Sequence, residues 1–213
     1  MMSSTKDSLS LYLHKKKLSD EEFQAISFLI KNENKDSILS KLKKDLIREY
    51  LNIAINSDHI FLFSCRIKNE IVGYAWLAKK PKYLIIEFSD LKFKILFNLI
   101  KKMKLILLLN IIISLCRFYL LFLKKKNKDL IKNSLNLNLL AIKKQFQSTG
   151  IGKTFSQNIF KKIHQDLYKF DKISVEAPNM KSCNFYLNKL NFRLIGKKIR
   201  LFKFFFVLLK EKS

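Results

Sequence analysis

The stretch Gln147–Phe155, QSTGIGKTF, holds two of the four glycines in a chain of 213 residues, and its nature decides how the rest of the sequence is interpreted. Its ending, GKT, is also the ending of a nucleotide-binding P-loop, in which a glycine, any four residues and then Gly-Lys-Ser or Gly-Lys-Thr surround a phosphate. Gln147 stands where the first glycine of that loop is required. Too few residues follow Thr154 to supply the remaining strands of a P-loop domain, so the sequence favours another kind of phosphate-binding turn.

A turn of the form Gln-x-x-Gly-x-Gly is matched by Gln147, Gly150 and Gly152. Glycines allow the N–H groups of such a turn to converge on a pyrophosphate, and the N-terminus of a following helix adds positive potential. The neighbouring segments predict a strand before the turn, over residues 137–142, and an amphipathic helix after it, over residues 153–170. The apolar face of that helix consists of Phe155, Ile159, Ile163 and Leu167.

Helix and strand patterns alternate along the rest of the chain. Ser19 and three acidic residues open a first helical pattern, and either Asp36 or Ser37 caps a second. Two strand-like runs separated by KNE then have the signature of a hairpin. The predicted elements are helices over residues 19–32 and 36–56, strands over 60–67, 71–79 and 137–142, a helix over 153–170, a strand over 172–177, a helix over 182–190, and strands over 192–196 and 199–209 joined through Lys197 and Lys198. This is a mixed α/β (α+β) pattern around one sheet.

A second motif lies downstream, in NMKSCNFYLNKLNF, where Asn179 follows a strand, Tyr186 lies in a short helix, and Asn191 and Phe192 end that helix. Together with the glycine turn and the order of elements, it resembles the GNAT superfamily of N-acetyltransferases. The resemblance runs from about Leu18 to the C-terminus, with specific motifs only in residues 137–192. It implies a single domain over residues 1–213 with a mostly antiparallel central sheet flanked by helices. A basic, apolar, helical insertion at about residues 88–132 would separate the third and fourth strands.

The resemblance also implies a site for acetyl-CoA as the acyl donor, with no metal. In the family, the backbone amides of the glycine turn grip the pyrophosphate, the preceding strand holds the pantetheine arm and the acetyl carbonyl, and the Asn of the second motif contacts the cofactor. The implied cofactor-binding residues are Leu140, Ala141, Ile142, Gln147, Ser148, Thr149, Gly150, Ile151, Gly152, Lys153, Thr154 and Asn179.

Tyr186 is implied to be the catalytic acid that protonates the departing thiolate of CoA. A phenol can do this, although its ordinary pKa of about 10 lies above that of a thiol at about 8.5, so the local field and geometry must favour the transfer. The alternative is that Tyr186 is a core aromatic residue with a satisfied hydroxyl.

Two residues depart from the family pattern. Thr149 stands where a basic residue is frequent, which removes one phosphate partner but no backbone donor. Asn191 stands where a glycine usually precedes Phe. Asn tolerates the left-handed conformation better than other side chains, so we expect the turn to keep its shape.

No general base is identifiable from the motifs. Glu87, Glu176, His59 and His164 are all candidates, of which His164, in the helix after the turn, has the pattern of a surface residue. A water-mediated route for the proton of the amine is equally compatible with the sequence.

The charge balance is strongly basic, with 42 Lys and Arg against 17 Asp and Glu and a formal net charge of +25. Such an excess implies anionic partners, although a compositional drift toward Lys explains it equally well. Nucleic acid is not favoured, because the aromatic residues lie in apolar runs and do not alternate with Lys. Cys65, Cys116 and Cys183 are far apart and predict reduced thiols. With no secretory signal in the first 20 residues, we expect a cytoplasmic protein.

The segment from residue 92 to residue 128 is basic and has no acidic residue, and it surrounds the apolar run 105–123, whose one charge is Arg117. This run is long enough to span a bilayer. A single span would nevertheless place neighbouring strands of one sheet on opposite sides of a membrane, and residues 91–100 are too short for a second span. The remaining options are an anchor on an anionic membrane surface, helices packed on the domain, or a homodimer contact. The polybasic ends favour the anchor, at the inner face of the membrane.

The sequence therefore predicts an N-acetyltransferase that transfers acetyl from acetyl-CoA to a primary amine by direct attack in a ternary complex. By analogy of architecture, the acceptor is a small molecule, with amino sugars among the candidates, while a protein amino group stays open. The alternative is a non-catalytic basic protein on the same fold that binds a membrane surface or nucleic acid.

Overall fold

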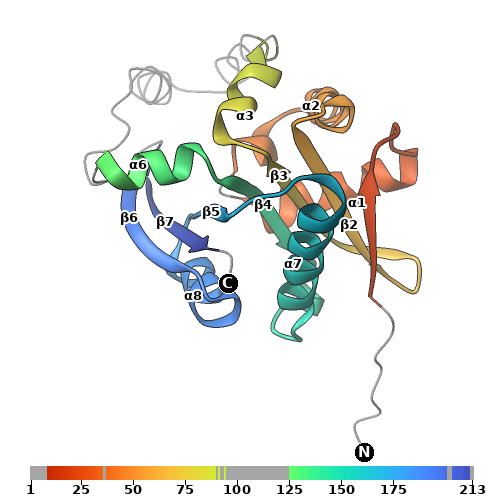
Figure 1. The fold of residues 1–213 in the computed structure, drawn as a ribbon. Helices are drawn as coiled ribbons and strands as arrows, with labels where there is room; N and C mark the ends of the chain where they lie inside the picture. Colours follow the sequence, from red (N-terminus) through yellow and green to blue (C-terminus); the bar gives the residue numbers. More distant parts are fainter. Residues whose placement is uncertain are drawn as a thin grey trace, which may run out of the picture.

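The computed structural model describes residues 9–35, 37–89, 91, 94, 125–200 and 203–211. In this part of the chain, strands form one sheet with the order β1-β2-β3-β4-β5-β7-β6 (Figure 1). The strands are β1 (Ser10–His14), β2 (Ile60–Ile67), β3 (Glu70–Ala78), β4 (Leu135–Ile142), β5 (Lys172–Ala177), β6 (Arg193–Arg200) and β7 (Lys203–Glu211). β4 and β5 are parallel, and the other neighbouring pairs are antiparallel. The predicted fold class, a mostly antiparallel sheet with flanking helices, is therefore confirmed.

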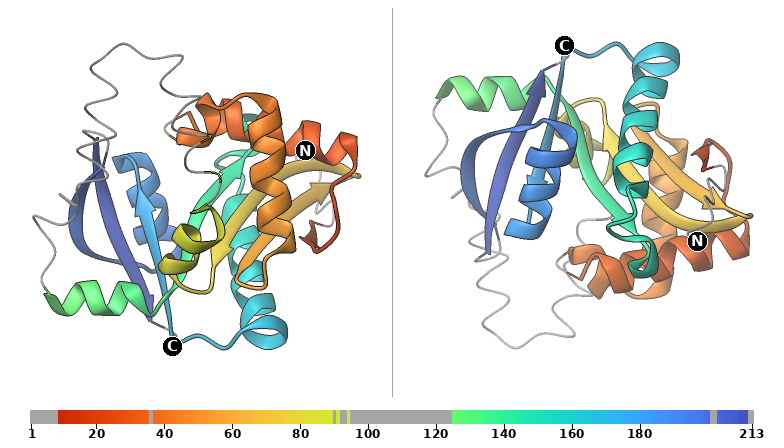
Figure 2. Two further views of the ribbon diagram at one scale, coloured as in Figure 1. Left: turned by 90° about the horizontal axis from the view of Figure 1, so that it is seen from above. Right: turned by 90° about the horizontal axis from the view of Figure 1, so that it is seen from below.

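Helices cover both faces of this sheet, as the two views of Figure 2 show. They are α1 (Asp20–Glu33), α2 (Lys44–Asn56), α3 (Pro81–Glu87), α6 (Lys125–Lys132), α7 (Ile151–Lys162) and α8 (Met180–Leu190), with short turns η1 (Ile38–Lys41), η2 (Lys144–Phe146) and η3 (Ile163–Leu167). α7 and α8 pack on one face, which we call the α7–α8 face, in an apolar cluster that includes Phe155 and Leu190. α1 and α2 pack on the other, the α1–α2 face, in a cluster that includes Ile26, Leu51 and Trp76.

Local sequence explains how the first elements begin and turn. Ser19 caps α1, because its hydroxyl accepts the N–H of Glu22 at 3.2 Å while its own N–H donates to the Glu22 carboxylate at 3.0 Å. The β2–β3 hairpin turns at Lys68 and Asn69, whose φ angles of 48° and 69° are both left-handed. Two such residues match the right-handed twist of the flanking strands. The predicted hairpin is therefore confirmed.

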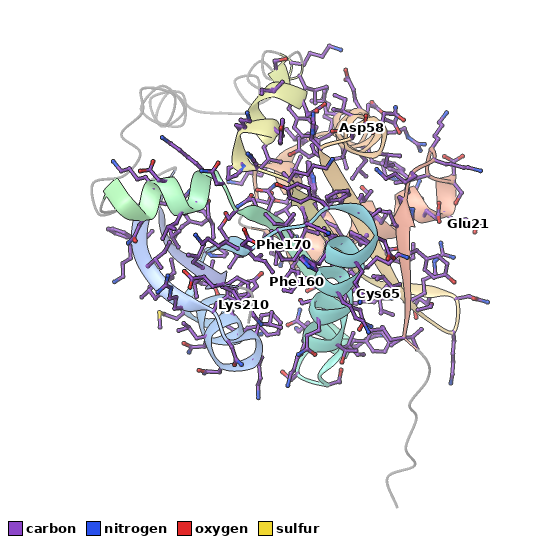
Figure 3. All side chains as sticks on the ribbon, in the orientation of Figure 1. Glu21, Asp58, Cys65, Phe160, Phe170 and Lys210 are labelled. Atoms are coloured by element: carbon purple, nitrogen blue, oxygen red, sulfur yellow. The ribbon has the colours of Figure 1, made fainter. Side chains whose placement is uncertain are left out.

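The core beneath α7 is tightly filled. Phe160 of α7 and Phe170, just before β5, belong to the same apolar cluster and lie among the side chains of this layer (Figure 3). Gly73 of β3 allows a close approach of β4. A side chain there would stand 2.8 Å from the sulfur of Cys65 and 2.9 Å from the carbonyl oxygen of Ala141, closer than a Cβ atom normally comes.

β4 and β5 separate soon after they meet. Their pairing begins at Leu135 with Ile173 and ends at Leu137 with Val175. On the opposite edge of β4, the register with β3 shifts by one residue, so that Asn138 forms a β-bulge. Past this point β4 stays paired with β3, and β5 with β7, so the two strands diverge (Figure 2). We call the opening beyond Leu137 and Val175 the fork.

Two predicted elements differ from the structure in their boundaries. The second helix does not run from residue 36, because Leu42 and Lys43 are extended between η1 and α2. Leu42 inserts its side chain into the core of the α1–α2 face, where it is 1% exposed, and this burial overrides the helical pattern. The predicted joint between the last strands is also wrong. Lys197 and Lys198 lie inside β6, where Lys198 forms a partly buried ion pair with Glu176.

Two further differences concern β1, which the sequence did not predict, and the bounds of the helix after the glycine turn. β1 is a strand of five residues that pairs with β2, and it is too short to give a clear alternating pattern. The helix predicted over residues 153–170 begins two residues earlier, at Ile151, and its regular part ends at Lys162, where η3 takes over with a wider π-type turn.

The apolar run 105–123 and most of the insertion predicted at about residues 88–132 lie outside the described residues. Its two ends are attached to the domain. Before the run, Lys94 forms an ion pair with Glu49 of α2 at 2.7 Å, and after it, Asn127 of α6 donates a hydrogen bond to the carbonyl of Ile195 in β6 at 2.8 Å. Within the described part of the chain, none of the helices is both long and apolar enough to cross a membrane.

Candidate active site

The glycine turn leads directly into α7. Gly150 is the N-cap of this helix, in a left-handed conformation with φ 92°, and its carbonyl accepts the N–H of Thr154 at 3.1 Å. That is the first hydrogen bond of the helix. The amides of Ile151, Gly152 and Lys153 precede it, and these are the donors that a helix N-terminus offers to an anion. The cap itself contributes no side-chain hydrogen bond.

The two glycines of the turn have different roles. Gly150 is required for its backbone conformation, because its φ is strongly positive. Space is not the reason, since an added Cβ would meet nothing within 4 Å. Gly152 has an ordinary helical backbone, and an added Cβ would find ordinary contacts with Phe185 at 3.5 Å and Ile142 at 3.6 Å. The protein itself therefore does not require glycine at position 152. A small residue there leaves room for a ligand to approach the backbone.

Gln147 ties this turn to three other elements. Its amide nitrogen donates to the carbonyl of Ile142 at the end of β4, at 3.0 Å, and to Glu33 at the end of α1, at 3.1 Å. Glu33 also accepts the N–H of Lys144 at 3.1 Å. The amide oxygen of Gln147 accepts from Lys181 of α8 at 3.3 Å. Because α8 follows β5, Gln147 and Lys181 face each other across the mouth of the fork.

The other residues of the turn are exposed, and one of them forms a hydrogen bond to the backbone of the turn. Ser148 has a left-handed φ of 66° and is exposed. The hydroxyl of Thr149 donates to the carbonyl of Phe146 at 2.8 Å, which closes the turn on itself. Lys153 and Thr154 are exposed in the first turn of α7. These residues follow the end of β4, where the fork is bordered by β4 on one side only.

The predicted pantetheine-binding residues lie on the open edge of β4. Leu140, Ala141 and Ile142 pair with β3 on one side only, since the pairing of β4 with β5 has already ended. Ala141 and Ile142 are buried, at 5% and 8% exposure. Backbone groups along an unpaired strand edge can bind an extended ligand as another strand would.

Asn179 and Asn191 mark the two ends of α8. The side-chain oxygen of Asn179 accepts the N–H of Ser182 at 2.9 Å and caps the helix, so this residue has a structural role. Asn191 is left-handed, with φ 56° and ψ 42°, which is the conformation that a glycine usually provides after a helix. The helix then closes with a hydrogen bond from the N–H of Phe192 to the carbonyl of Tyr186 at 3.0 Å.

Tyr186 lies in the apolar cluster of the α7–α8 face, where its ring packs edge-on against Phe185 and Phe192. The side chain is 7% exposed, and burial raises the pKa of Tyr186, so the phenol stays protonated across the physiological range. Its hydroxyl makes no hydrogen bond to a described residue. The oxygen is also not among the fully buried polar atoms, so it is accessible from outside the core. This differs from a core tyrosine with a satisfied hydroxyl.

The α1–α2 face of the sheet is polar where β4 and β5 pair and at the start of the fork, which the motifs did not predict. Leu135 and Leu137, like Ile173, Val175 and Ala177, turn toward the apolar cluster, so the residues between them point to the opposite face. These are Asn136 of β4 and Ser174 and Glu176 of β5, which with Lys198 of β6 form what we call the polar seam. The alternation in LNLN and ISVEA is the sequence signal that could have revealed it.

Hydrogen bonds join the lower part of the polar seam. Ser134 donates to the hydroxyl of Ser174 at 2.6 Å, and the amide nitrogen of Asn136 donates to the same hydroxyl at 3.1 Å. All three side chains are buried. Glu176 and Lys198 form an ion pair one step further along the strands, beside the fork.

The structure separates the other candidate bases from the fork. His59 stacks on Tyr83 of α3, with ring centroids 3.8 Å apart, next to the first residue of β2. Glu87 is the last residue of α3. The ring of His164, in η3, accepts the N–H of Phe170 at 3.4 Å. Of the four candidates, only Glu176 lies on a strand that borders the fork.

The described residues contain neither a cluster that could bind a metal ion nor a reactive thiol. No group of three His, Cys, Asp or Glu residues there could hold a metal ion. Cys65 and Cys183 are free thiols. Burial raises the pKa of Cys65 to about 12 and also raises that of Cys183, so both are inert at neutral pH. Cys116 lies outside the described residues.

Comparison with known proteins identifies the fold. No protein-family model matches the sequence, and no curated protein matches it either. Solved structures match over almost the whole length. A GNAT-family protein from Desulfovibrio desulfuricans is 8% identical with a TM-score of 0.57, covering 96% of this chain and 99% of its own. The PaiA N-acetyltransferase of Thermoplasma acidophilum, solved in complex with coenzyme A, is 13% identical with a TM-score of 0.51, covering 95% and 99%.

A third match is the polyamine N-acetyltransferase of Drosophila melanogaster, which forms N-acetylagmatine. It is 10% identical with a TM-score of 0.57, covering 95% of this chain and all of the other. At such low identity the likeness concerns the fold. The chain has the fold of the GNAT N-acetyltransferase superfamily, as the sequence motifs predicted.

Proposed function

We propose that the protein is an acetyl-CoA-dependent N-acetyltransferase that transfers acetyl to the primary amine of a small molecule, by direct attack in a ternary complex. The observation that supports this best is the position of the glycine turn. It lies at the mouth of the fork, where the first amides of α7 and the open edge of β4 meet.

The residues at this mouth fit acetyl-CoA. The amides of Ile151, Gly152 and Lys153 would bind its pyrophosphate, and the spare room at Gly152 suits a ligand that comes close to the backbone. Lys181, which reaches Gln147 across the fork, adds a positive charge where the family's basic residue is replaced by Thr149.

The strand residues at the fork extend the same site. The open edge formed by Leu140, Ala141 and Ile142 would bind the pantetheine arm along the strand. When bound, acetyl-CoA supplies an acetyl group activated as a thioester. Asn179, besides capping α8, is placed at the β5 side of the same opening.

Tyr186 is the acid in this proposal. Its phenol is protonated, because burial raises its pKa, and its hydroxyl has no hydrogen-bond partner among the described residues. A proton held in this way can be given to a developing thiolate when the two atoms come within hydrogen-bond distance. The aromatic packing by Phe185 and Phe192 fixes the ring in place.

A small amine is the acceptor that we propose. The Drosophila neighbour, a polyamine N-acetyltransferase with the same fold, supports this choice, and amino sugars belong in the same test panel. Attachment to an anionic membrane through residues 92–128, dimer formation and a cytoplasmic location stay predictions. Flotation with anionic liposomes, with and without residues 92–128, tests the first of these, since unchanged partition would remove the anchor hypothesis.

Thiol release tests the proposed function. Acetyl-CoA is offered with a panel of polyamines, arylalkylamines and amino sugars, and free CoA is measured. We expect release above the background rate with at least one amine, and a rise in melting temperature with CoA that N-acetylcysteamine, which lacks the pyrophosphate, does not give. Absence of both turnover and any acetyl-CoA-dependent stabilisation would leave the non-catalytic binding protein as the better hypothesis.

A further inference from the structure

The Glu176–Lys198 pair is placed at the one point of the sheet where the fork begins. Val175 is the last residue of β5 that pairs with β4, and Glu176 is the next. Glu176 pairs instead with Val207 of β7, whose partner on β6 is Gly196, a residue without a side chain. Lys198, two residues further along β6, can therefore extend across β7 to the carboxylate.

The two members of this pair differ in their exposure. The Lys198 side chain is 10% exposed, whereas the Glu176 side chain is 27% exposed. The ammonium is thus the inner partner, and the carboxylate is the part of the pair that solvent or a ligand can reach. A neutral pair of similar size would be at least as stable in such a place, because the desolvation of two charges offsets most of their attraction. Stability alone does not account for this pair.

The pair also lies on the face opposite Tyr186. Glu176 alternates along β5 with Val175 and Ala177, which belong to the apolar cluster that includes Tyr186. A planar acetyl group held in the fork would therefore have Tyr186 on one side and Glu176 on the other. An incoming nitrogen adds to one face of the planar acetyl carbon, so the acid that protonates the departing sulfur can stand on the other side.

We propose that Glu176 binds the ammonium group of the acceptor and accepts its proton, and that Lys198 is a positioning residue that holds this carboxylate oriented at the fork. The acceptor class that follows is a basic aliphatic amine, which is an ammonium ion at neutral pH. This inference rests on the proposed function and adds the residue that the motifs leave open.

The protons and bonds balance as follows. An ammonium nitrogen carries three protons, and the amide product keeps one. The first proton goes to Glu176, which frees the lone pair. The nitrogen then bonds to the acetyl carbon while the carbon–sulfur bond breaks, and the sulfur receives a proton from Tyr186. The second proton lost by the nitrogen returns to Tyr186 through water, and Glu176 releases its proton to solvent.

Matched amines of different basicity test this role. Ethylamine and trifluoroethylamine are similar in size, but at pH 7 the first is protonated and the second is neutral. We expect Glu176→Gln to lower kcat/KM for ethylamine by about 10²–10⁴-fold, the range of a general base, and to lower that for trifluoroethylamine much less. The control is Glu211→Gln on β7, whose carboxylate pairs with Arg193 at 2.7 Å and should leave both amines unaffected.

A binding measurement without turnover gives a second readout. With CoA present in place of acetyl-CoA, ethylammonium is titrated and its saturation transfer is followed by NMR. We expect weaker binding to Glu176→Gln than to the original protein, with an unchanged affinity for CoA. An equal loss of CoA affinity would mean that the substitution disturbs the fork as a whole, which contradicts the proposed role.

Lys198→Met tests the positioning role, with Lys197→Met as its control. Lys197 is adjacent in sequence but lies over the ring of Phe206, on the α7–α8 face. We expect Lys198→Met to lower kcat for ethylamine more than it raises KM, with CoA affinity unchanged, because the carboxylate of Glu176 loses the partner that orients it. Lys197→Met should leave both kinetic constants unchanged.

A further variant guards against misfolding. If Glu176→Gln fails to fold because Lys198 is left buried and unpaired, the double variant Glu176→Gln/Lys198→Met removes both charges, and it should bind CoA yet transfer acetyl poorly to ethylamine. Full activity of either folded variant on ethylamine would overturn the inference while leaving the acetyltransferase function intact. Failure of the original protein to release CoA with any amine would instead overturn the proposed function.

Discussion

The two faces of the fork are built from different parts of the chain. On the α7–α8 face, the candidate groups are backbone amides in a single turn, Gly150–Lys153, together with Tyr186 in an apolar setting. On the α1–α2 face, they are the side chains of the polar seam, contributed by β4, β5 and β6. One face thus offers fixed dipoles for an anion, and the other offers charges for a cation.

This difference explains why one face is easy to predict and the other is not. A site built from backbone amides needs glycines at fixed spacing, so it leaves a continuous motif in the sequence. A site built from side chains of separate strands needs only the right residue at each register position.

Removing the hydroxyl of Tyr186 should have the largest effect. We expect Tyr186→Phe to lower kcat by about 10²–10³-fold, because the thiolate loses its proton donor, while acetyl-CoA affinity is unchanged. Steady-state kinetics and calorimetric titration measure the two quantities. Tyr168→Phe, after η3, is the matched control. An undiminished kcat in Tyr186→Phe would show that the α7–α8 face provides binding but no acid.

Breaking the lower part of the polar seam should reduce stability and leave cofactor binding intact. Asn136→Ala removes a donor to Ser174, and it should lower the free energy of unfolding by about 1–3 kcal/mol. Urea denaturation measures this. In a double-mutant cycle with Ser174→Ala, we expect the two losses to be less than additive, since they share one hydrogen bond. A loss of acetyl-CoA affinity in folded Asn136→Ala would contradict the separation of the two faces.

Substitutions of the two glycines test which of them contacts the cofactor and which one the fold requires. Gly152→Ala should keep its melting temperature and bind acetyl-CoA roughly tenfold more weakly, a loss of about 1.4 kcal/mol, because its Cβ occupies the ligand's space. Gly150→Ala should lose about 1 kcal/mol of stability, since its φ of 92° strains any side chain. Thermal unfolding and titration distinguish these outcomes. The reverse pattern would assign the ligand contact to Gly150.

The smallest effect concerns a histidine far from the fork. His14 of β1 is buried beside Ser64, at 2.8 Å, and desolvation lowers its pKa, with Glu22 raising it and Arg66 lowering it to smaller extents. In the unfolded chain it takes up a proton near pH 6.5, whereas the folded protein resists protonation. The contribution of His14 to the free energy of unfolding is therefore fully present above pH 6.5. It is lost as the pH falls below that value, with a slope of at most about 1.4 kcal/mol per pH unit.

Urea denaturation between pH 7 and pH 5.5 measures this slope for His14. The slope should disappear in His14→Gln and persist in His164→Gln. Equal slopes in the original protein and in His14→Gln would assign the titration to another group. In either case acetyl-CoA affinity should not follow the change, because β1 lies three strands away from β4.

Much of the fold followed from local patterns. The hairpin at Lys68 and Asn69, the strand over residues 172–177 and the helix capped by Ser19 all appear where periodicity and capping placed them. The errors occur where tertiary contacts override a local signal. Leu42 interrupts a helical pattern to reach the core, and Lys198 continues a strand because Glu176 neutralises it.

The candidate site divides in the same way. The sequence by itself determined the glycine turn, the left-handed end of α8 at Asn191 and the fold class, because these depend on backbone conformation and on residues close in the chain. Only the tertiary structure placed Glu176 beside Lys198 at the opening between β4 and β5. That placement depends on strand order and register, which bring distant residues together by packing. The alternation in ISVEA indicates the face on which Glu176 lies but not its partner on β6.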